Sequence, residues 1–157
     1  MWWKELFFTG LYSGYSRFAP GTAGTILAAL IYIFEHIVFG YLDQTVNLIV
    51  VLVLMYPSIK ACDAGEKFFN TKDPSEIVLD EMMGYWVSVL FFPFNIKIVI
   101  LAFIIFRILD IFKPYPINKM EKLKGGLGIM MDDVISGVYA NLIIRIIILF
   151  AGMFIQI

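Results

Sequence analysis

Two pairs of adjacent carboxylates are the residues of this sequence best suited to chemistry. Asp80-Glu81 and Asp132-Asp133 each stand where a long apolar stretch begins. If such a stretch enters a membrane, ionisable side chains at its edge are costly and are therefore functional candidates. Hard oxygen ligands suit Mg²⁺, which keeps several waters and binds through one or two carboxylates plus substrate phosphates. We therefore expect Asp80, Glu81, Asp132 and Asp133 to hold one or two Mg²⁺ ions.

More acidic side chains lie upstream of the first pair. The Asp73-Pro74 step is typical of a helix start, and a helix from there would place Asp73, Glu76 and Asp80 on one face. Like charges on one face repel, so a protein that keeps them usually neutralises them with cations or a metal. Asp63 and Glu66 are candidates for the same electronegative cluster.

Two glycine-rich segments are candidates for binding a phosphate. In the first, Arg17 offers a planar fork of donors ahead of a predicted helix whose first turn contains Thr22. The free N–H groups of a helix start suit an anion, although a start that is merely capped by threonines fits the pattern too. In the second, Lys124 and the N–H groups around Gly126 precede the second aspartate pair.

A further candidate pair is Asp110 and Lys113, which stand three residues apart just before Pro114 and Pro116. The two prolines predict that a helix ends here in a stiff turn. Lys113 is a candidate phosphate contact, and Asp110 is a candidate base or a group that orients Lys113. The alternative interpretation is a salt bridge at the membrane interface.

Two kinds of phosphatase chemistry are disfavoured by what the chain lacks. Cys62 is the only cysteine and no Cys-x₅-Arg motif is present, so a cysteinyl-phosphate route is disfavoured. A disulfide within the chain is impossible and a thiolate zinc site is disfavoured, so we interpret Cys62 as a packing residue. The only histidine, His36, lies far from the acidic segments along the chain, which disfavours a phosphohistidine route.

The composition indicates that the surrounding solvent is lipid. Hydrophobic residues make up 61% of the chain and charged residues 16%, against about 45–50% and 25% in soluble domains. The uncharged or nearly uncharged runs 18–34, 44–59 and 134–157 approach the roughly 20 residues of a membrane span. The runs 82–96 and 98–106 are shorter, and they predict either two tilted spans or a re-entrant hairpin.

Positive charge is segregated along the chain. Ten of the twelve Lys and Arg residues lie near the N-terminus or in the segments 60–81 and 107–133, and the exceptions are Lys97 and Arg145. The positive-inside rule places these segments in the cytoplasm. The chain must then cross the membrane an even number of times, or not at all, within residues 82–106, which argues against a single kinked helix there.

These patterns together predict an all-α, polytopic membrane bundle with its active site at the cytoplasmic edge. We expect one membrane-embedded domain over residues 1–157. Its first residues predict an amphipathic anchor that lies on the membrane, with Trp2, Trp3, Phe7 and Phe8 dipping into the interface.

Four blocks of the sequence resemble the phosphatidylglycerophosphatase A family in order and spacing. The blocks are 14–25 with its core Ala-Pro-Gly-Thr-x-Gly-Thr, 73–84, 110–116 with Asp-x-x-Lys-Pro-x-Pro, and 125–133 with Gly-Gly-x-Gly-Ile-Met-x-Asp-Asp. Each block is moderately specific, and the four together are highly specific. Ser136-Gly137, where Ala-Gly is expected, is a minor departure.

The resemblance implies an enzyme of phospholipid biosynthesis at the bacterial inner membrane. Its reaction would be Mg²⁺-dependent hydrolysis of the terminal phosphomonoester of phosphatidylglycerophosphate, giving inorganic phosphate and phosphatidylglycerol, a cardiolipin precursor. The implied partner is a phospholipid substrate, and no nucleic acid is expected. Attack by water and a carboxyl-phosphate intermediate both stay open.

Combining this resemblance with the residue patterns, we assign three groups of site residues. The predicted catalytic residues are Asp80, Asp110, Asp132 and Asp133. The predicted phosphate-binding residues are Arg17, Thr22, Lys113, Lys124 and Gly126. The predicted metal ligands are Asp80, Glu81, Asp132 and Asp133.

Two other classes of protein were weighed against this hypothesis. A small transporter or channel subunit would use Glu35 and Arg145, which lie within or beside apolar runs. Such a protein would place its acids near the middle of the bilayer, whereas here they gather at one edge. A CDP-alcohol phosphotransferase would carry a longer signature of glycine, arginine and aspartate residues that the chain lacks.

Overall fold

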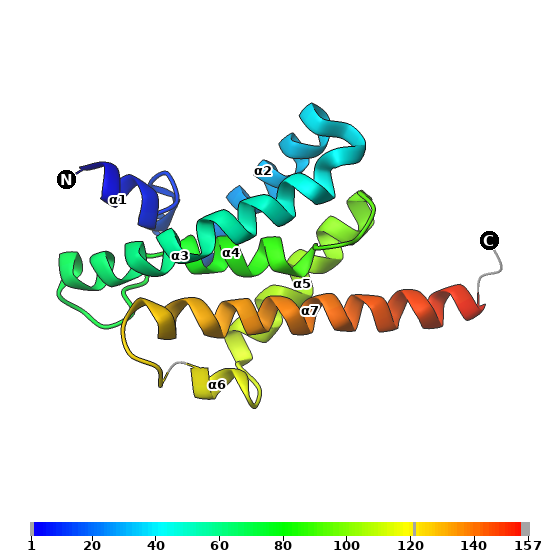
Figure 1. Ribbon diagram of the computed structural model, residues 1–157. Coiled ribbons are helices and arrows are strands. Elements are labelled where there is room, and N and C mark those ends of the chain that lie inside the picture. The colour runs from blue at the N-terminus through cyan, green and yellow to red at the C-terminus, as the bar shows by residue number, and fades with distance from the viewer. Residues whose placement is uncertain (1, 121, 155–157) are drawn as a thin grey trace.

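The computed structural model describes residues 2–120 and 122–154, the last four by backbone alone. All regular structure in this part of the chain is helical, which confirms the predicted all-α class (Figure 1). The elements are α1 (Trp2–Phe8), η1 (Ser13–Tyr15), α2 (Pro20–Phe39), η2 (Gly40–Leu42), α3 (Asp43–Phe69), α4 (Leu79–Ser88), α5 (Ile96–Phe112), α6 (Ile117–Met120) and α7 (Gly126–Phe154).

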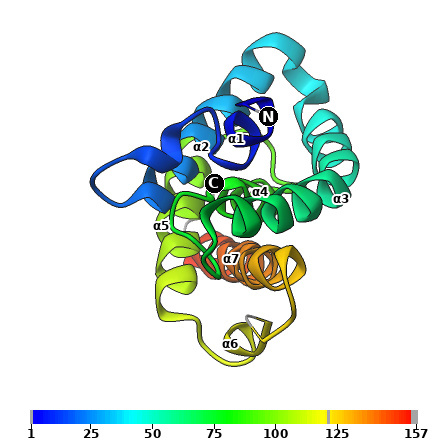
Figure 2. The same ribbon diagram turned by 90° about the vertical axis from the view of Figure 1, so that its left-hand side faces the viewer.

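Helix α4 forms the centre of the bundle. Every residue of α4 except Glu81 is buried, because α2, α3, α5 and α7 all pack against it (Figures 1 and 2). Two hydrogen bonds fix it laterally: the Trp86 indole N–H donates to the Ala28 carbonyl at 3.1 Å, and the Asn47 amide donates to the Trp86 carbonyl at 3.1 Å. A polar helix start can therefore be held deep inside an apolar protein.

The middle of the chain, residues 82–106, is a short helix followed by a longer one. Helix α4 has 10 residues and rises about 15 Å, about half of the roughly 30 Å hydrocarbon thickness of a bilayer. Helix α5 has 17 residues and begins where the Asn95 side chain accepts the Lys97 N–H at 2.9 Å. The chain turns back between them, so it forms a hairpin and not one kinked helix.

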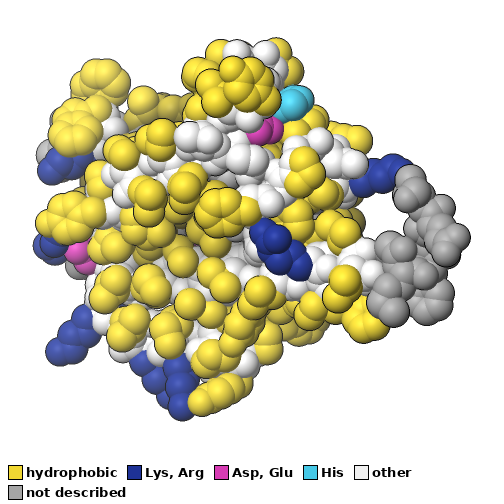
Figure 3. All heavy atoms as spheres, turned by 45° about the vertical axis from the view of Figure 1, so that its right-hand side comes forward, with side chains coloured by type: hydrophobic (Ala, Val, Ile, Leu, Met, Phe, Trp, Pro, Cys, Tyr) yellow, Lys and Arg dark blue, Asp and Glu magenta, His cyan; other side chains and the backbone are white. Residues whose placement is uncertain are grey.

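Two stretches, Pro20–Phe69 and Gly126–Phe150, are long and apolar enough to cross a membrane by length and composition. Helix α3 runs past the predicted end of its apolar run and continues through Pro57 to Phe69. Figure 3 shows a face covered mostly by hydrophobic side chains, with Lys and Arg gathered chiefly along one edge. Such a surface suits a lipid environment.

The predicted helix start at Asp73-Pro74 is wrong. The segment between α3 and α4 is not helical, and Asp73 has a φ of 48°. The Asp73 N–H donates to the Glu66 side chain at 3.1 Å, and the Val78 N–H donates to the Phe8 carbonyl at 3.1 Å. These contacts hold the segment in a bent, non-helical course, so Asp73, Glu76 and Asp80 do not share a helical face.

Two predictions about helix ends are also corrected. Helix α2 follows Ala19, whose φ is 49°, and it has no side-chain cap; the Thr25 hydroxyl instead donates to the Gly21 carbonyl inside the helix at 2.8 Å. The segment expected to be a glycine loop before the second aspartate pair is the first turn of α7, which begins at Gly126. A Cβ at Gly126 would overlap the Ile59 carbonyl, so the glycine lets α7 start directly against α3.

The N-terminal helix only partly matches the predicted membrane anchor. Trp2 and Trp3 are 70% and 58% exposed, as an interfacial anchor requires. Phe8 is buried instead, because its ring packs against Phe68 and Phe69 at centroid distances of 5.7 and 5.8 Å. Phe8, which was expected to enter lipid, therefore packs helix α1 against the end of α3.

Bare backbone at a glycine pair brings α4 and α7 into contact. A Cβ at Gly84 would lie 2.6 Å from the Asp133 carbonyl oxygen, and one at Gly137 would overlap the Gly84 carbonyl oxygen. Because real Cβ atoms do not approach so closely, any larger residue would push the two helices apart. The glycines therefore set the distance between the acidic residues that the two helices carry.

We expect Gly137→Val to destabilise the fold by about 1–3 kcal/mol, the usual effect of overpacking a tight contact. The thermal unfolding midpoint of the purified protein in detergent would measure the effect. The control is Val138→Leu at the adjacent, exposed position of α7. Equal midpoints for the two variants would contradict the close approach at Gly137.

Candidate active site

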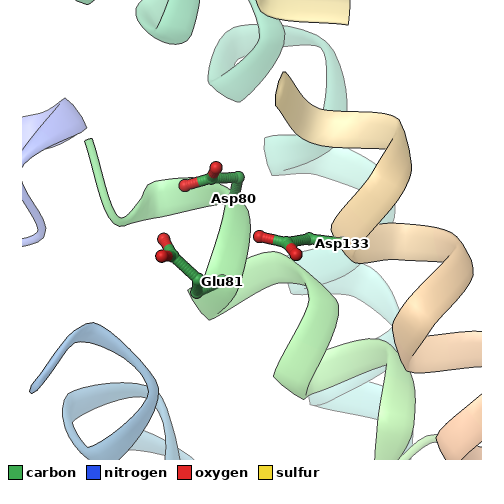
Figure 4. Close-up of side chains that lie close together, drawn as sticks. All are labelled: Asp80, Glu81 and Asp133. Carbon is green, nitrogen blue, oxygen red and sulfur yellow. The ribbon is translucent and has the colours of Figure 1, made fainter. Parts of the chain in front are cut away.

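Three carboxylates meet where α4 begins and α7 completes its second turn. Asp80 and Glu81 lie in the first turn of α4, and Asp133 lies on α7. One carboxylate oxygen from each lies within 4.8 Å of the other two, and Figure 4 shows the three groups side by side. Asp80 and Asp133 are only 6% and 3% exposed. We call these three residues the carboxylate cluster.

The carboxylate cluster has buried oxygens without hydrogen-bond donors and little neighbouring positive charge. Asp80 Oδ1, Glu81 Oε2 and Asp133 Oδ1 are buried and accept no hydrogen bond within the described part of the chain. Burial, followed by the charges of Glu81 and Asp133, raises the pKa of Asp80 well above its usual range, and burial raises the pKa of Glu81 to about 7. A compact set of hard oxygen donors in this state fits a divalent cation such as Mg²⁺.

One arginine flanks the carboxylate cluster. Arg107, in the last turns of α5, places Nη1 4.0 Å from Glu81 Oε1 and 2.5 Å from Asp110 Oδ2. Asp110 is buried and its charge contributes to the raised pKa of Glu81, so it belongs to the same site. Asp110 was predicted to act as a base or to orient Lys113, and in the structure it also pairs with the arginine one turn back on its own helix.

The other aspartate of α7, Asp132, belongs to a separate ion pair. Asp132 Oδ2 lies 2.6 Å from Lys113 Nζ, and the carboxylate is 4% exposed. Asp132 is not among the residues whose carboxylate oxygens meet in the carboxylate cluster. Asp132 also lines a cavity of about 210 Å³ with Lys72 and Asp73. The predicted set of four metal-binding carboxylates is thus divided between two adjacent places.

The first turn of α2 also touches the carboxylate cluster. A Cβ at Gly21 would overlap Glu81 Oε1 and would lie 3.1 Å from Arg107 Nη2. Thr22, half-buried, follows in the same turn, and Arg17 is exposed in the preceding loop. The positive end of the α2 dipole therefore lies against the acidic residues, close to where a phosphate would meet a cation.

Two other predicted phosphate contacts lie elsewhere. The Gly126 N–H donates to Asp63 Oδ1 at 2.6 Å, so this donor is taken by a carboxylate and not offered to phosphate. Lys124 is exposed and lines an open pocket of about 480 Å³ together with Lys67, Lys72 and Lys122. This pocket shares residues with the cavity beside Asp132, so it forms a lysine-rich approach to that side of the site.

Arg107 is the functional candidate that sequence patterns missed. The available signal was its spacing, since Arg107 stands three residues before Asp110 and such positions are neighbours on a helix. Its contact with Glu81 needs the tertiary structure, because Glu81 comes from another helix.

Two other ionisable residues of the apolar runs have structural contacts, whereas Glu35 Oε2 is buried and accepts no hydrogen bond within the described residues. His36 Nδ1 lies 2.9 Å from Asp43 Oδ2, and the His36 ring stacks on Phe94 with centroids 3.8 Å apart. The Arg145 guanidinium lies over the Phe92 ring at 4.6 Å. These contacts tie α2 and α7 to the turn between α4 and α5, away from the carboxylate cluster.

We expect Lys113→Met to destabilise the protein by about 1–3 kcal/mol, because it leaves the buried Asp132 carboxylate without its partner. The double variant Lys113→Met/Asp132→Asn should recover most of that loss. Thermal unfolding of the purified proteins tests both expectations, with Lys119→Met as the control at an exposed lysine. A Lys113→Met variant as stable as Lys119→Met would contradict the ion pair.

Comparison with known proteins identifies the family. The family model described as Phosphatidylglycerophosphatase A matches residues 6–148. A Bacteroides thetaiotaomicron protein named "Putative phosphatidylinositol-3-phosphatase" is 45% identical over 143 residues, covering 88% of this chain and 89% of its own. Phosphatidylglycerophosphatase A of Escherichia coli is 36% identical over 141 residues, covering 85% of this chain and 77% of its own.

A third relative agrees with the family match. Phosphatidylglycerophosphatase A of Haemophilus influenzae is 30% identical over 142 residues, covering 89% of this chain and 85% of its own. No solved structure is significantly similar to this chain. The chain belongs to the phosphatidylglycerophosphatase A family and is a phosphatase.

Proposed function

We propose that this phosphatase hydrolyses the terminal phosphomonoester of phosphatidylglycerophosphate to give phosphatidylglycerol and inorganic phosphate, and that it requires Mg²⁺. The observation that carries the proposal is the carboxylate cluster of Asp80, Glu81 and Asp133. Each of the three has a buried oxygen that accepts no hydrogen bond in the described part of the chain, and Arg107 lies next to the cluster. Two relatives bear the name of this activity, at 36% and 30% identity.

The carboxylate cluster would hold the metal, and the neighbouring groups would position the phosphate. Bound Mg²⁺ supplies charge neutralisation at the phosphoryl group and a site for activating water. Arg107 and the N–H groups of the first turn of α2 lie on one side of the cluster, so they are placed to bind phosphate oxygens. Because phosphoryl transfer depends mainly on positioning and charge neutralisation, this arrangement suits the reaction.

The two flanking aspartates take supporting roles in this proposal. Asp110 holds Arg107 in place through their short ion pair. Asp132 holds Lys113, whose ammonium group would meet the phosphate from the other side of the cluster. The lysine-rich pocket of Lys67, Lys72, Lys122 and Lys124 would attract anionic headgroups toward the site.

A phosphoinositide is the second candidate substrate. The relative at 45% identity is named for activity on phosphatidylinositol 3-phosphate. That lipid and phosphatidylglycerophosphate both carry a phosphomonoester on the headgroup of a phospholipid, so the same cluster could act on either. A direct comparison of the two lipids as substrates would decide between them.

We expect Asp80→Asn and Asp133→Asn each to lower phosphate release from phosphatidylglycerophosphate by at least about 100-fold, because each removes charge that the metal requires. Release by the wild-type protein should need added Mg²⁺ and should stop with excess EDTA. The assay uses purified protein in detergent micelles. Phosphatidylinositol 3-phosphate serves as a parallel substrate.

Glu76→Gln is the matched control, because Glu76 is an acid of the segment leading into α4 that lies outside the carboxylate cluster. It should retain activity near that of the wild type. If both aspartate variants keep Mg²⁺-dependent activity, the proposed metal ligands are wrong. Faster release from phosphatidylinositol 3-phosphate than from phosphatidylglycerophosphate would favour the second substrate.

We also propose that this protein crosses the bacterial inner membrane several times and has its site at the cytoplasmic edge. The end of α3, helix α6 and the loops that lead into α4 and α7 lie at one end of the molecule, and the turn between α2 and α3 lies at the other (Figure 1). The first end carries Lys67, Lys72, Lys119, Lys122 and Lys124, whereas the turn carries no cation. The positive-inside rule places the first end in the cytoplasm. Helix α4, too short to span, would enter from that side and turn back into α5.

We expect a cysteine at Tyr41, in the exposed turn between α2 and α3, to react with a membrane-impermeant maleimide in intact spheroplasts. A cysteine at the exposed Lys122 should react only after lysis. Both changes would be made in a Cys62→Ala background, because Cys62 is the chain's own thiol. The opposite labelling pattern would reverse the proposed orientation.

A further inference from the structure

Helices α2 and α5 enclose an apolar groove on the outside of the bundle. Its volume is about 240 Å³, and it is lined by Ile26, Ala29, Leu30, Val99, Ile100 and Phe103. Val99 and the half-buried Ala29 contribute short side chains, whereas Ile26, Leu30 and Ile100 are about half exposed. The lining contains no charged or polar side chain, so the groove suits a hydrocarbon.

The two helices that line the groove, α2 and α5, also carry groups that flank the carboxylate cluster. Gly21 at the start of α2 touches both Glu81 and Arg107, and Arg107 stands near the end of α5. On α2 the groove residues follow Gly21 by five to nine positions, which is about 7–14 Å along the axis. On α5 they precede Arg107 by four to eight positions, or about 6–12 Å. Both helices therefore lead from the site into the groove.

We propose that this groove holds an acyl chain of the lipid substrate and thereby places the phosphomonoester at the carboxylate cluster. The inference rests on the proposed function, because only a phospholipid substrate brings an acyl chain to the site. The chain would run between α2 and α5 while the headgroup lies at Gly21 and Arg107. The substrate then never leaves the bilayer.

A second apolar hollow is less suited to this role. It lies between α1 and α3, has a volume of about 410 Å³, and includes Lys4 and Lys60 in its lining. None of its lining residues belongs to the carboxylate cluster, to α2 or to α5. An acyl chain there would not direct its headgroup to the site.

The groove would act by positioning the reacting phosphate, and it would add little to the affinity for the lipid. Lipid tails are as apolar as the side chains of the groove, so moving a chain from bilayer to groove gains little hydrophobic free energy. Correct placement of the reacting group matters more, since a displacement of about 1 Å can lower the rate about 100-fold. Filling the groove should therefore impair turnover of long-chain substrate specifically.

The experiment fills the groove in two ways and compares two substrates. Ala29→Phe adds bulk at the inner wall, and Leu30→Trp adds bulk at the exposed rim, where folding is less at risk. Ile37→Trp is the control, because Ile37 is 72% exposed on the same helix but lies outside the groove. The substrates are dipalmitoyl phosphatidylglycerophosphate in mixed micelles and its dibutanoyl analogue, whose chains are too short to fill the groove.

We expect both groove variants to lower kcat/KM for the dipalmitoyl substrate by about tenfold or more, with little change for the dibutanoyl analogue. Ile37→Trp should match the wild type on both. Unchanged long-chain turnover in the groove variants, or an equal loss on both substrates, would overturn the groove assignment. A folded wild-type protein that acts on neither substrate would instead overturn the proposed function, and the groove assignment with it.

Discussion

The structure depends on burying several carboxylates together inside an apolar protein. Asp80, Glu81 and Asp133 lie within reach of one ligand, and an isolated buried carboxylate would be strongly unfavourable. Arg107 and the first turn of α2 supply part of the opposing charge at this centre. The oxygens that remain without partners indicate that the protein alone does not complete the balance. In the function proposed above, a bound cation would do so.

Helix contacts at glycine make that arrangement possible. Gly84 and Gly137 allow α4 and α7 to approach with backbone against backbone, and Gly21 allows α2 to approach Glu81. In a lipid environment, close packing of small residues is a main source of helix association, because apolar surface alone favours protein and lipid equally. The same glycines therefore serve both the stability of the bundle and the geometry of its acidic centre.

The opposite end of the bundle shows that ionisable residues in apolar helices need not be functional in catalysis. His36 is held by Asp43 and Phe94, and Arg145 lies over Phe92. Each is thus explained by local contacts that close the hairpin between α4 and α5. The proposed site lies instead where acids, an arginine and a helix start converge.

The sequence by itself determined the helical class, the apolar surface, the family and the acidic residues from which a site could be built. It could not determine how those residues divide. Asp80 and Glu81 are adjacent and both belong to the carboxylate cluster, whereas of the adjacent Asp132 and Asp133 only Asp133 does, and Asp132 pairs with Lys113. The Gly126 N–H is taken by Asp63, which lies 63 residues away in the chain. Such pairings are decided by tertiary structure, because direction and distance between helices leave no periodic signal in the sequence.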